Sequence, residues 1–124
     1  MQKILLIALG GACGALARYG LGGVVQKTLG DGFPWGTAVV NILGCGLFGV
    51  FWALAVERGH FNAEIRALVL VGFLGSFTTF STFIFETGHL MTDSELFAGL
   101  ANIAFQIIAG IFLFFLGLNA GRIL

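Results

Sequence analysis

The sequence predicts an all-α membrane protein with four transmembrane helices, and three observations support that fold class. Of the 124 residues, 58% are apolar and only 10% are charged, a composition typical of membrane proteins. Four apolar segments approach the roughly 20 residues that a helix needs to cross a bilayer. Short polar segments separate them and leave no room for a soluble domain. The predicted spans are residues 4–25, 35–56, 67–90 and 96–118, within a single domain formed by residues 1–124.

The first apolar segment imitates a secretory signal peptide. Lys3 precedes it, and the small residues at positions 15–17 resemble a cleavage site. We reject this interpretation because the apolar run continues past Arg18 to Val25, and three further apolar segments follow it. The segment is therefore interpreted as a transmembrane helix.

Turn and cap residues mark the other helix boundaries. A Gly/Asp/Pro turn at residues 30–34 ends with Pro34, where a second helix can begin. Thr92 or Asp93 is expected to cap the fourth helix, with Glu95 in the first turn of that helix.

The third span contains the most informative stretch of the chain, Gly-Phe-Leu-Gly-Ser-Phe-Thr-Thr-Phe-Ser-Thr-Phe at residues 72–83. It places glycines and hydroxyls in the middle of an apolar segment. In a bilayer, the backbone groups freed by a helix break must be satisfied inside the protein, so a break is tolerated only where it lines a cavity or is covered. The stretch therefore indicates a functional site at membrane depth.

Polar side chains recur along one face of this span. Thr79, Thr82 and Glu86 follow the helical spacing i, i+3, i+7 and form a stripe that should face protein or water. Hydrogen bonding between helices explains the stripe as well as an ion path does. Phe80 and Phe83 alternate with the hydroxyls. Such rings usually face lipid or core, but their electropositive edges can also attract an anion.

Amide side chains and one arginine lie inside the other predicted spans. Asn41 needs a partner, which is either another helix or a desolvated anion. Arg18 is the cation placed deepest within a span, and its two interpretations, an anion vestibule and a structural anchor, stay open. Asn102 and Gln106, one turn apart in the fourth span, favour hydrogen bonding between helices.

Composition and motifs argue against several classes of function. Six basic and six acidic side chains cancel, so no basic surface is available for a nucleic acid. Cys13 and Cys45 lack metal-binding spacing and are interpreted as small buried apolar residues. The sequence contains no GxSxG, P-loop, HExxH or paired-carboxylate pattern, so it does not predict an enzyme.

The glycine content indicates close helix packing and self-association. Several of the 20 glycines recur at the spacing that lets membrane helices approach closely. Four helices enclose little interior, so the polar residues at mid-membrane are expected to need a second copy of the chain. Basic residues favour cytoplasmic termini, but the bias is small and insertion in both orientations stays open.

Three motifs together resemble the Fluc/CrcB family of fluoride channels. They are Gly-Ala-Leu-Ala-Arg-Tyr at residues 14–19, Pro-Trp-Gly-Thr and Val-Asn-Ile-Leu-Gly at residues 34–37 and 40–44, and the stretch at residues 72–83. Thr-Thr-Phe-Ser-Thr-Phe within that stretch is the most specific part. The match spans nearly the whole chain.

This resemblance implies an antiparallel, dual-topology homodimer in the bacterial plasma (inner) membrane, with the third helix broken at its middle and two fluoride paths along the subunit interface. It also implies passive fluoride efflux that lowers cytoplasmic fluoride and confers fluoride resistance. The backbone carbonyls of Gly75 and Thr78 would hold a structural sodium ion that is not transported. The residues that the resemblance assigns to the fluoride paths are Arg18, Asn41, Thr79, Phe80, Ser81, Thr82, Phe83 and Glu86, with Gln106 at a position where the family often has serine.

A coupled transporter is the main alternative, because small four-helix multidrug antiporters also form dual-orientation dimers. Those proteins depend on a carboxylate in the first helix, where this chain has Arg18 and no acid. The acid in its membrane region is Glu86, near the end of the third span. An accessory subunit, a further alternative, would not need the polar residues at mid-membrane.

Overall fold

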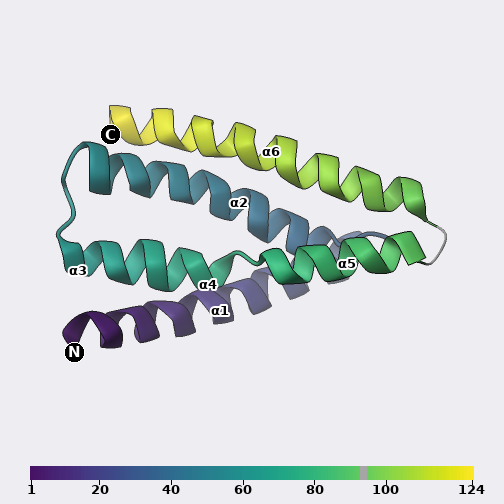
Figure 1. Ribbon diagram of the computed structural model, residues 1–124, viewed down its shortest axis with the longest axis horizontal. Coiled ribbons are helices and arrows are strands. Elements are labelled where there is room, and N and C mark those ends of the chain that lie inside the picture. Colours follow the sequence, from purple (N-terminus) through teal and green to yellow (C-terminus); the bar gives the residue numbers. More distant parts are fainter. Residues whose placement is uncertain (93–94) are drawn as a thin grey trace.

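Four long helical rods lie side by side in the computed structural model, which describes residues 1–92 and 95–124 (Figure 1). Each rod is long and apolar enough to cross a membrane. This confirms the predicted all-α membrane fold with four spanning helices. The rods are α1 (Gln2–Leu29), α2 (Trp35–Trp52) with its π-helical continuation Ala53–Glu57, the composite third rod Ala63–Thr92, and α6 (Leu96–Ile123).

The rods extend beyond most of the predicted spans. At 28 residues, α1 and α6 are each about 42 Å long, more than the hydrocarbon core of about 30 Å requires. Hydropathy detects only the apolar part of such a helix, so its polar ends were not predicted. The second rod begins at Trp35, directly after Pro34, as predicted.

One predicted helix cap is wrong. Thr92 is the last residue of α5 (Phe80–Thr92), and its hydroxyl donates to the carbonyl of His89 at 2.9 Å. Asp93, the alternative cap, lies outside the described residues. Glu95 immediately precedes α6 rather than occupying its first turn.

The third rod is interrupted near its middle. It begins with α3 (Ala63–Arg66), where the Asn62 side chain accepts the N–H of Ile65, and continues through the π-helical segment Ala67–Leu74 and the short α4 (Gly75–Phe77). Thr78 is extended, with φ −83° and ψ 155°, and α5 begins two residues later. Figure 1 shows this break between α4 and α5. The predicted break is therefore confirmed, and it falls at residues 78–79.

Glycines allow close contact between neighbouring rods. On α1, a Cβ at Gly10 or Gly14 would collide with the backbone of the third rod at Leu68 and Phe73. Between α2 and α6, a Cβ at Gly117 would collide with the carbonyl of Gly46. These contacts are the small-residue packing expected for membrane helices.

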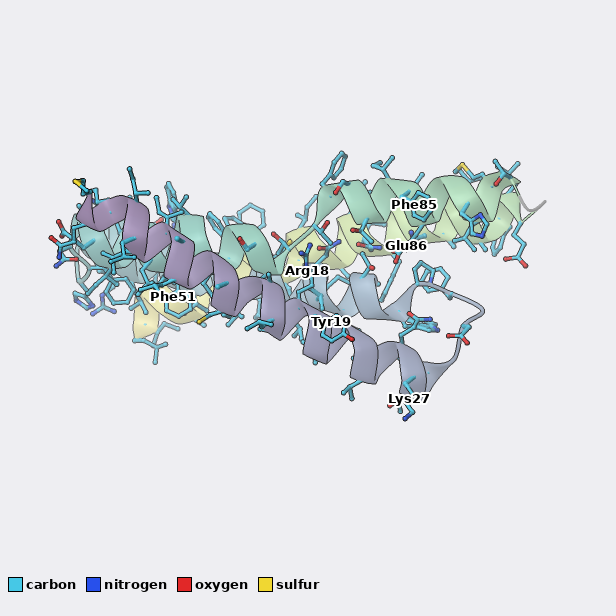
Figure 2. All side chains as sticks on the ribbon, turned by 90° about the horizontal axis from the view of Figure 1, so that it is seen from below. Arg18, Tyr19, Lys27, Phe51, Phe85 and Glu86 are labelled. Atoms are coloured by element: carbon cyan, nitrogen blue, oxygen red, sulfur yellow. The ribbon has the colours of Figure 1, made fainter. Side chains whose placement is uncertain are left out.

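Both chain termini lie at one end of the molecule (Figure 1). The guanidinium of Arg122 donates to both carboxylate oxygens of Glu57, at 2.7 and 2.8 Å, and Arg58 donates to the Arg122 carbonyl at 3.0 Å. These bonds tie the loop after α2 to the end of α6. Lys27 lies at the opposite end of the molecule (Figure 2).

Candidate functional site

The helix break is held by the side chain of Asn41 on α2. The Asn41 amide nitrogen donates to the Thr79 carbonyl at 3.1 Å, and the Asn41 carbonyl oxygen accepts the Thr79 N–H at 2.8 Å. The Asn41 side chain thereby supplies an acceptor for the Thr79 N–H, which loses its helical partner at the break, and a donor to the Thr79 carbonyl. In a continuous α-helix the Thr79 N–H would donate to the carbonyl of Gly75. That carbonyl is therefore released from the helical bonding pattern.

Residues next to the break fit this arrangement. Gly44, one turn after Asn41 on α2, has no side chain, and a Cβ there would collide with the methyl group of Thr78. The Thr79 hydroxyl lies 3.0 Å from the Thr82 hydroxyl and 3.4 Å from the Thr82 N–H, at the start of α5. Because the Thr82 N–H points toward the Thr79 hydroxyl, it does not donate the i→i−4 helical hydrogen bond to the Thr78 carbonyl.

A chain of buried hydrogen bonds runs from Asn41 through α6 and back to α5. Asn41 donates its second amide hydrogen to the side-chain carbonyl of Gln106 at 2.8 Å, and Gln106 donates to Asn102 at 2.9 Å. Asn102 donates to the Thr87 hydroxyl at 2.8 Å, which donates to the Phe83 carbonyl at 2.7 Å. Asn102 is fully buried, at 0% exposure, and Gln106 and Thr87 are nearly so. This confirms bonding between helices for Asn102 and Gln106; sequence reasoning did not identify Thr87.

An apolar groove of about 550 Å³ adjoins the break on the side of α2 and α6. Its polar lining residues are Asn41, Thr78, Thr79 and Gln106. Phe80 and Phe83 line the α5 side. The two rings lie 5.8 Å apart between centroids and are tilted by 51°. Phe80 is 74% exposed, whereas Phe83 is 7% exposed. The structure therefore brings five of the residues predicted for the fluoride path, Thr79 among them, together in one groove that is open along Phe80.

A second hollow, of about 440 Å³, lies on the other side of the break, between α1, α2 and α5. Figure 2 shows Arg18 from α1 and Glu86 from α5 directed toward this space. Thr79 and Thr82 also line it, so Thr79 borders both spaces. The polar stripe predicted for the third span therefore faces protein and an internal hollow.

Charged groups in this hollow are only partly satisfied. The Thr37 hydroxyl donates to one oxygen of Glu86 at 2.8 Å, and the other carboxylate oxygen is buried without a hydrogen-bond partner among the described residues. Arg18 is half-buried and forms no hydrogen bond or ion pair with any residue that the structure describes. Its guanidinium is available to an anion entering the hollow.

The role of Ser81 stays a prediction, and the expected burial of Cys13 differs from the structure. Ser81 is exposed and is not among the residues that line the groove or the hollow. Cys13 was expected to be buried, but it lies on an exposed face of α1, and Cys45 is half-buried beside the groove. Apolar composition does not distinguish a lipid-facing position from a core position in a membrane helix, which is why burial of Cys13 was predicted wrongly.

The hydrogen bonds determine which donors remain available. Both amide hydrogens of Asn41 are used within the chain. The hydroxyls of Thr79 and Thr82 share one hydrogen bond, so one of their two hydrogens has no acceptor among the described residues. Together with the Arg18 guanidinium and the ring edges of the phenylalanines, this hydroxyl makes the region suitable for an anion.

The break also supplies oxygen atoms that suit a hard cation. The carbonyls of Gly75 and Thr78 have both lost their α-helical partners to side chains, to Asn41 and to Thr79 respectively. Gly75 is exposed, and a Cβ there would meet only the Leu70 carbonyl, at 3.7 Å. Backbone oxygens of this kind are ligands that sodium accepts. The residues present therefore fit the structural sodium ion that the family resemblance implies.

A helix broken at mid-membrane, flanked by spaces with polar and aromatic linings, defines a multi-pass membrane protein of the channel or transporter class. Residues 5–118 match the family model described as CrcB-like protein, Camphor Resistance (CrcB), and the chain belongs to this family.

Curated relatives cover essentially the whole chain. A protein named fluoride-specific ion channel FluC from Solidesulfovibrio magneticus is 55% identical over 100% of this chain and 99% of its own length. A protein of the same name from Nitrosococcus oceani is 50% identical over 99% of this chain and 98% of its own. Another from Thermus thermophilus is 46% identical over 98% and 96% of the two chains. These relatives are named as ion channels and not as enzymes.

Proposed function

We propose that this chain forms a fluoride-selective ion channel through which fluoride leaves the cytoplasm passively. Relatives named as fluoride channels support this function over the full length of the chain. The structural observation that carries it is the break at residues 78–79, because it brings an aromatic groove and a hollow containing a free arginine to the same point in the membrane. Passive efflux lowers cytoplasmic fluoride and confers fluoride resistance.

Fluoride is small and strongly hydrated, so a channel must replace its water with several weak sites. Arg18 draws the anion into the hollow, where the Thr79 and Thr82 hydroxyls offer a hydrogen bond. The ring edges of Phe80 and Phe83 then provide partial positive charge along the groove without a full charge that would trap the ion. Ser81 is assigned a donor role on its exposed face of α5.

Asn41 and Gln106 act on the same path in a more constrained way. Both amide hydrogens of Asn41 are engaged, so it can donate to fluoride only by exchanging one of its present bonds. The bond to the Gln106 side chain is the one that can be exchanged without disturbing the backbone at Thr79. Gln106 thereby serves as the acceptor that fluoride displaces. Glu86, held by Thr37, borders the path in the same hollow as Arg18.

The groove and the exposed Phe80 favour completion of the site by a second copy of the chain. A phenylalanine that is 74% exposed beside this groove gains a defined orientation only when something covers it. We assign this role to a homodimer of oppositely inserted subunits in the bacterial inner membrane, with two fluoride paths along the interface. The small charge bias of the chain fits insertion in both orientations.

A sodium ion held by the carbonyls of Gly75 and Thr78 belongs to the same proposal. When bound, it supplies positive charge that stabilises the oxygens exposed by the break. Gly75 lies on the exposed side of the third rod, which suits an ion shared between two subunits. The ion is a fixed part of the assembly and is not transported.

Fluoride flux into proteoliposomes with and without a proton gradient tests this function against the transporter alternative. A channel passes fluoride down its own gradient at the same rate in both conditions, and it passes little chloride. Fluoride flux that requires protons, or that responds stoichiometrically to the proton gradient, would place the protein among the coupled transporters.

A further inference from the structure

The hydrogen-bond chain from the break to Thr87 has a single direction. It begins at the Thr79 N–H, which can only donate, and ends at the Phe83 carbonyl, which can only accept. Between these ends each amide donates toward Thr87 and accepts from the side of the break, and Asn41 donates its other hydrogen back to the Thr79 carbonyl. A 180° flip of any one of these side-chain amides would place two donors or two acceptors opposite each other. The orientation of Asn41 is therefore set from both ends of the chain.

Thr87 lies outside the groove, although it binds the carbonyl of Phe83, whose ring lines the groove. Thr87 follows Thr79 by eight residues on the same rod, a rise of about 12 Å along a helix. It lines neither the groove nor the hollow. The chain nevertheless returns to the break through α6 and α2, so that it closes a ring of bonds over three rods. Thr87 is nearly buried and Asn102 is fully buried, so bulk water does not compete for their hydrogen bonds.

We propose that Thr87 and Asn102 are positioning residues of the helix break: they orient the Gln106 amide, which orients Asn41 on Thr79. Removing the Thr87 hydroxyl leaves Asn102 with a buried N–H that has no acceptor. The Asn102 amide is then free to turn, Gln106 loses its fixed direction, and Asn41 loses the bond to Gln106, one of the three bonds that hold its amide. For its effect on conduction this inference rests on the proposed channel function; its effect on the break does not.

Replacement of Thr87 by valine and by serine separates the hydroxyl from the shape of the side chain. Thr87→Val keeps the volume and removes the hydroxyl, whereas Thr87→Ser keeps the hydroxyl and removes a methyl group. The readout is hydrogen exchange of the Thr79 backbone amide in protein labelled with ¹⁵N-threonine, compared with the amide of Thr28 on α1. We expect Thr87→Val to accelerate Thr79 exchange about fivefold or more, and Thr87→Ser to leave it within about twofold of the unmodified protein.

Fluoride flux adds a second readout with a matched control. Thr87→Val should lower the flux, and Thr87→Ser should retain it. Thr28→Val is the control, since the Thr28 hydroxyl also donates to a carbonyl four residues earlier but accepts nothing from another helix. In an Asn41→Ala background, Thr87→Val should cause no further loss, because both changes act through the same bonds.

Each outcome decides the inference. Unchanged Thr79 exchange in Thr87→Val, or equal damage by Thr87→Ser, would overturn the positioning role. Faster Thr79 exchange with unaltered fluoride flux would overturn its importance for conduction. If Thr87→Val does not fold, Thr87→Ala replaces it, and the same comparison with Thr87→Ser applies. Absence of fluoride flux in the unmodified protein would refute the channel proposal, while the exchange measurement would still test the positioning role.

Discussion

Replacing Asn41 by alanine should damage the helix break more than any other single change on α2. The substitution removes three hydrogen bonds at once, those to the Thr79 carbonyl, the Thr79 N–H and the Gln106 side chain. The Thr79 N–H then has no partner at a depth where unsatisfied backbone groups are costly. We expect Asn41→Ala to lower both the stability of the protein and its fluoride flux.

The magnitude follows from the bonds that are lost. Hydrogen bonds between membrane helices contribute about 0.6 kcal/mol each on average, so three of them contribute about 2 kcal/mol. A difference of about 2 kcal/mol changes an equilibrium about thirtyfold. The population of chains in which the break is held by α2 should fall by that factor, and the flux should fall with it.

Unfolding in a denaturing detergent measures the stability, and fluoride efflux from proteoliposomes measures the function. Asn119→Ala is the matched control, because Asn119 is an exposed asparagine near the end of α6 that accepts a hydrogen bond from Arg122 at 3.5 Å. The reasoning is refuted if Asn41→Ala matches Asn119→Ala in both measurements.

Three other perturbations test the groove, the hollow and the break. Phe83→Ile should reduce fluoride flux about fivefold, since a ring edge contributes on the order of 1 kcal/mol to its contact with an anion. Phe80→Ile should reduce the flux by the same factor. It should not lower the stability of the single chain, because Phe80 is exposed. Normal flux in both variants would remove the ring edges from the mechanism. Arg18→Gln should slow the initial rate of fluoride uptake at low concentration about tenfold and weaken the dependence of that rate on ionic strength. Initial rates measured across a salt series test this, and rates equal to those of the unmodified protein would contradict the role of Arg18. Replacing sodium with a large organic cation should weaken flux or dimer assembly if Gly75 and Thr78 hold the ion, and indifference to sodium in both assays would contradict that assignment.

Local sequence signals were sufficient to predict the four rods, because hydropathy depends only on runs of neighbouring residues. The glycines and hydroxyls at residues 72–83 drew attention to the third span, and the family resemblance predicted the break at its middle. The position of Pro34 before α2 is equally local. The homodimer, its orientation and the sodium ion stay predictions.

The pairing of distant side chains could not be read in the same way. Asn41 lies 38 residues from Thr79 and 65 from Gln106, and a single sequence carries no information on which polar residues meet across such distances. The two partners left open for Asn41 were another helix and an anion, and the structure engages it fully with the chain. Thr87 resembles any threonine that bonds back to its own helix, so only its contact with Asn102 reveals it.

The selectivity of ion efflux from a single vesicle preparation tests the central claim most directly. Vesicles containing the purified protein and loaded with both fluoride and chloride are diluted into a medium free of both halides, and each ion is followed with its own electrode. We predict that fluoride leaves within seconds while chloride stays inside. Equal efflux of both halides, or retention of fluoride, would contradict the assignment of the broken third helix to a fluoride path.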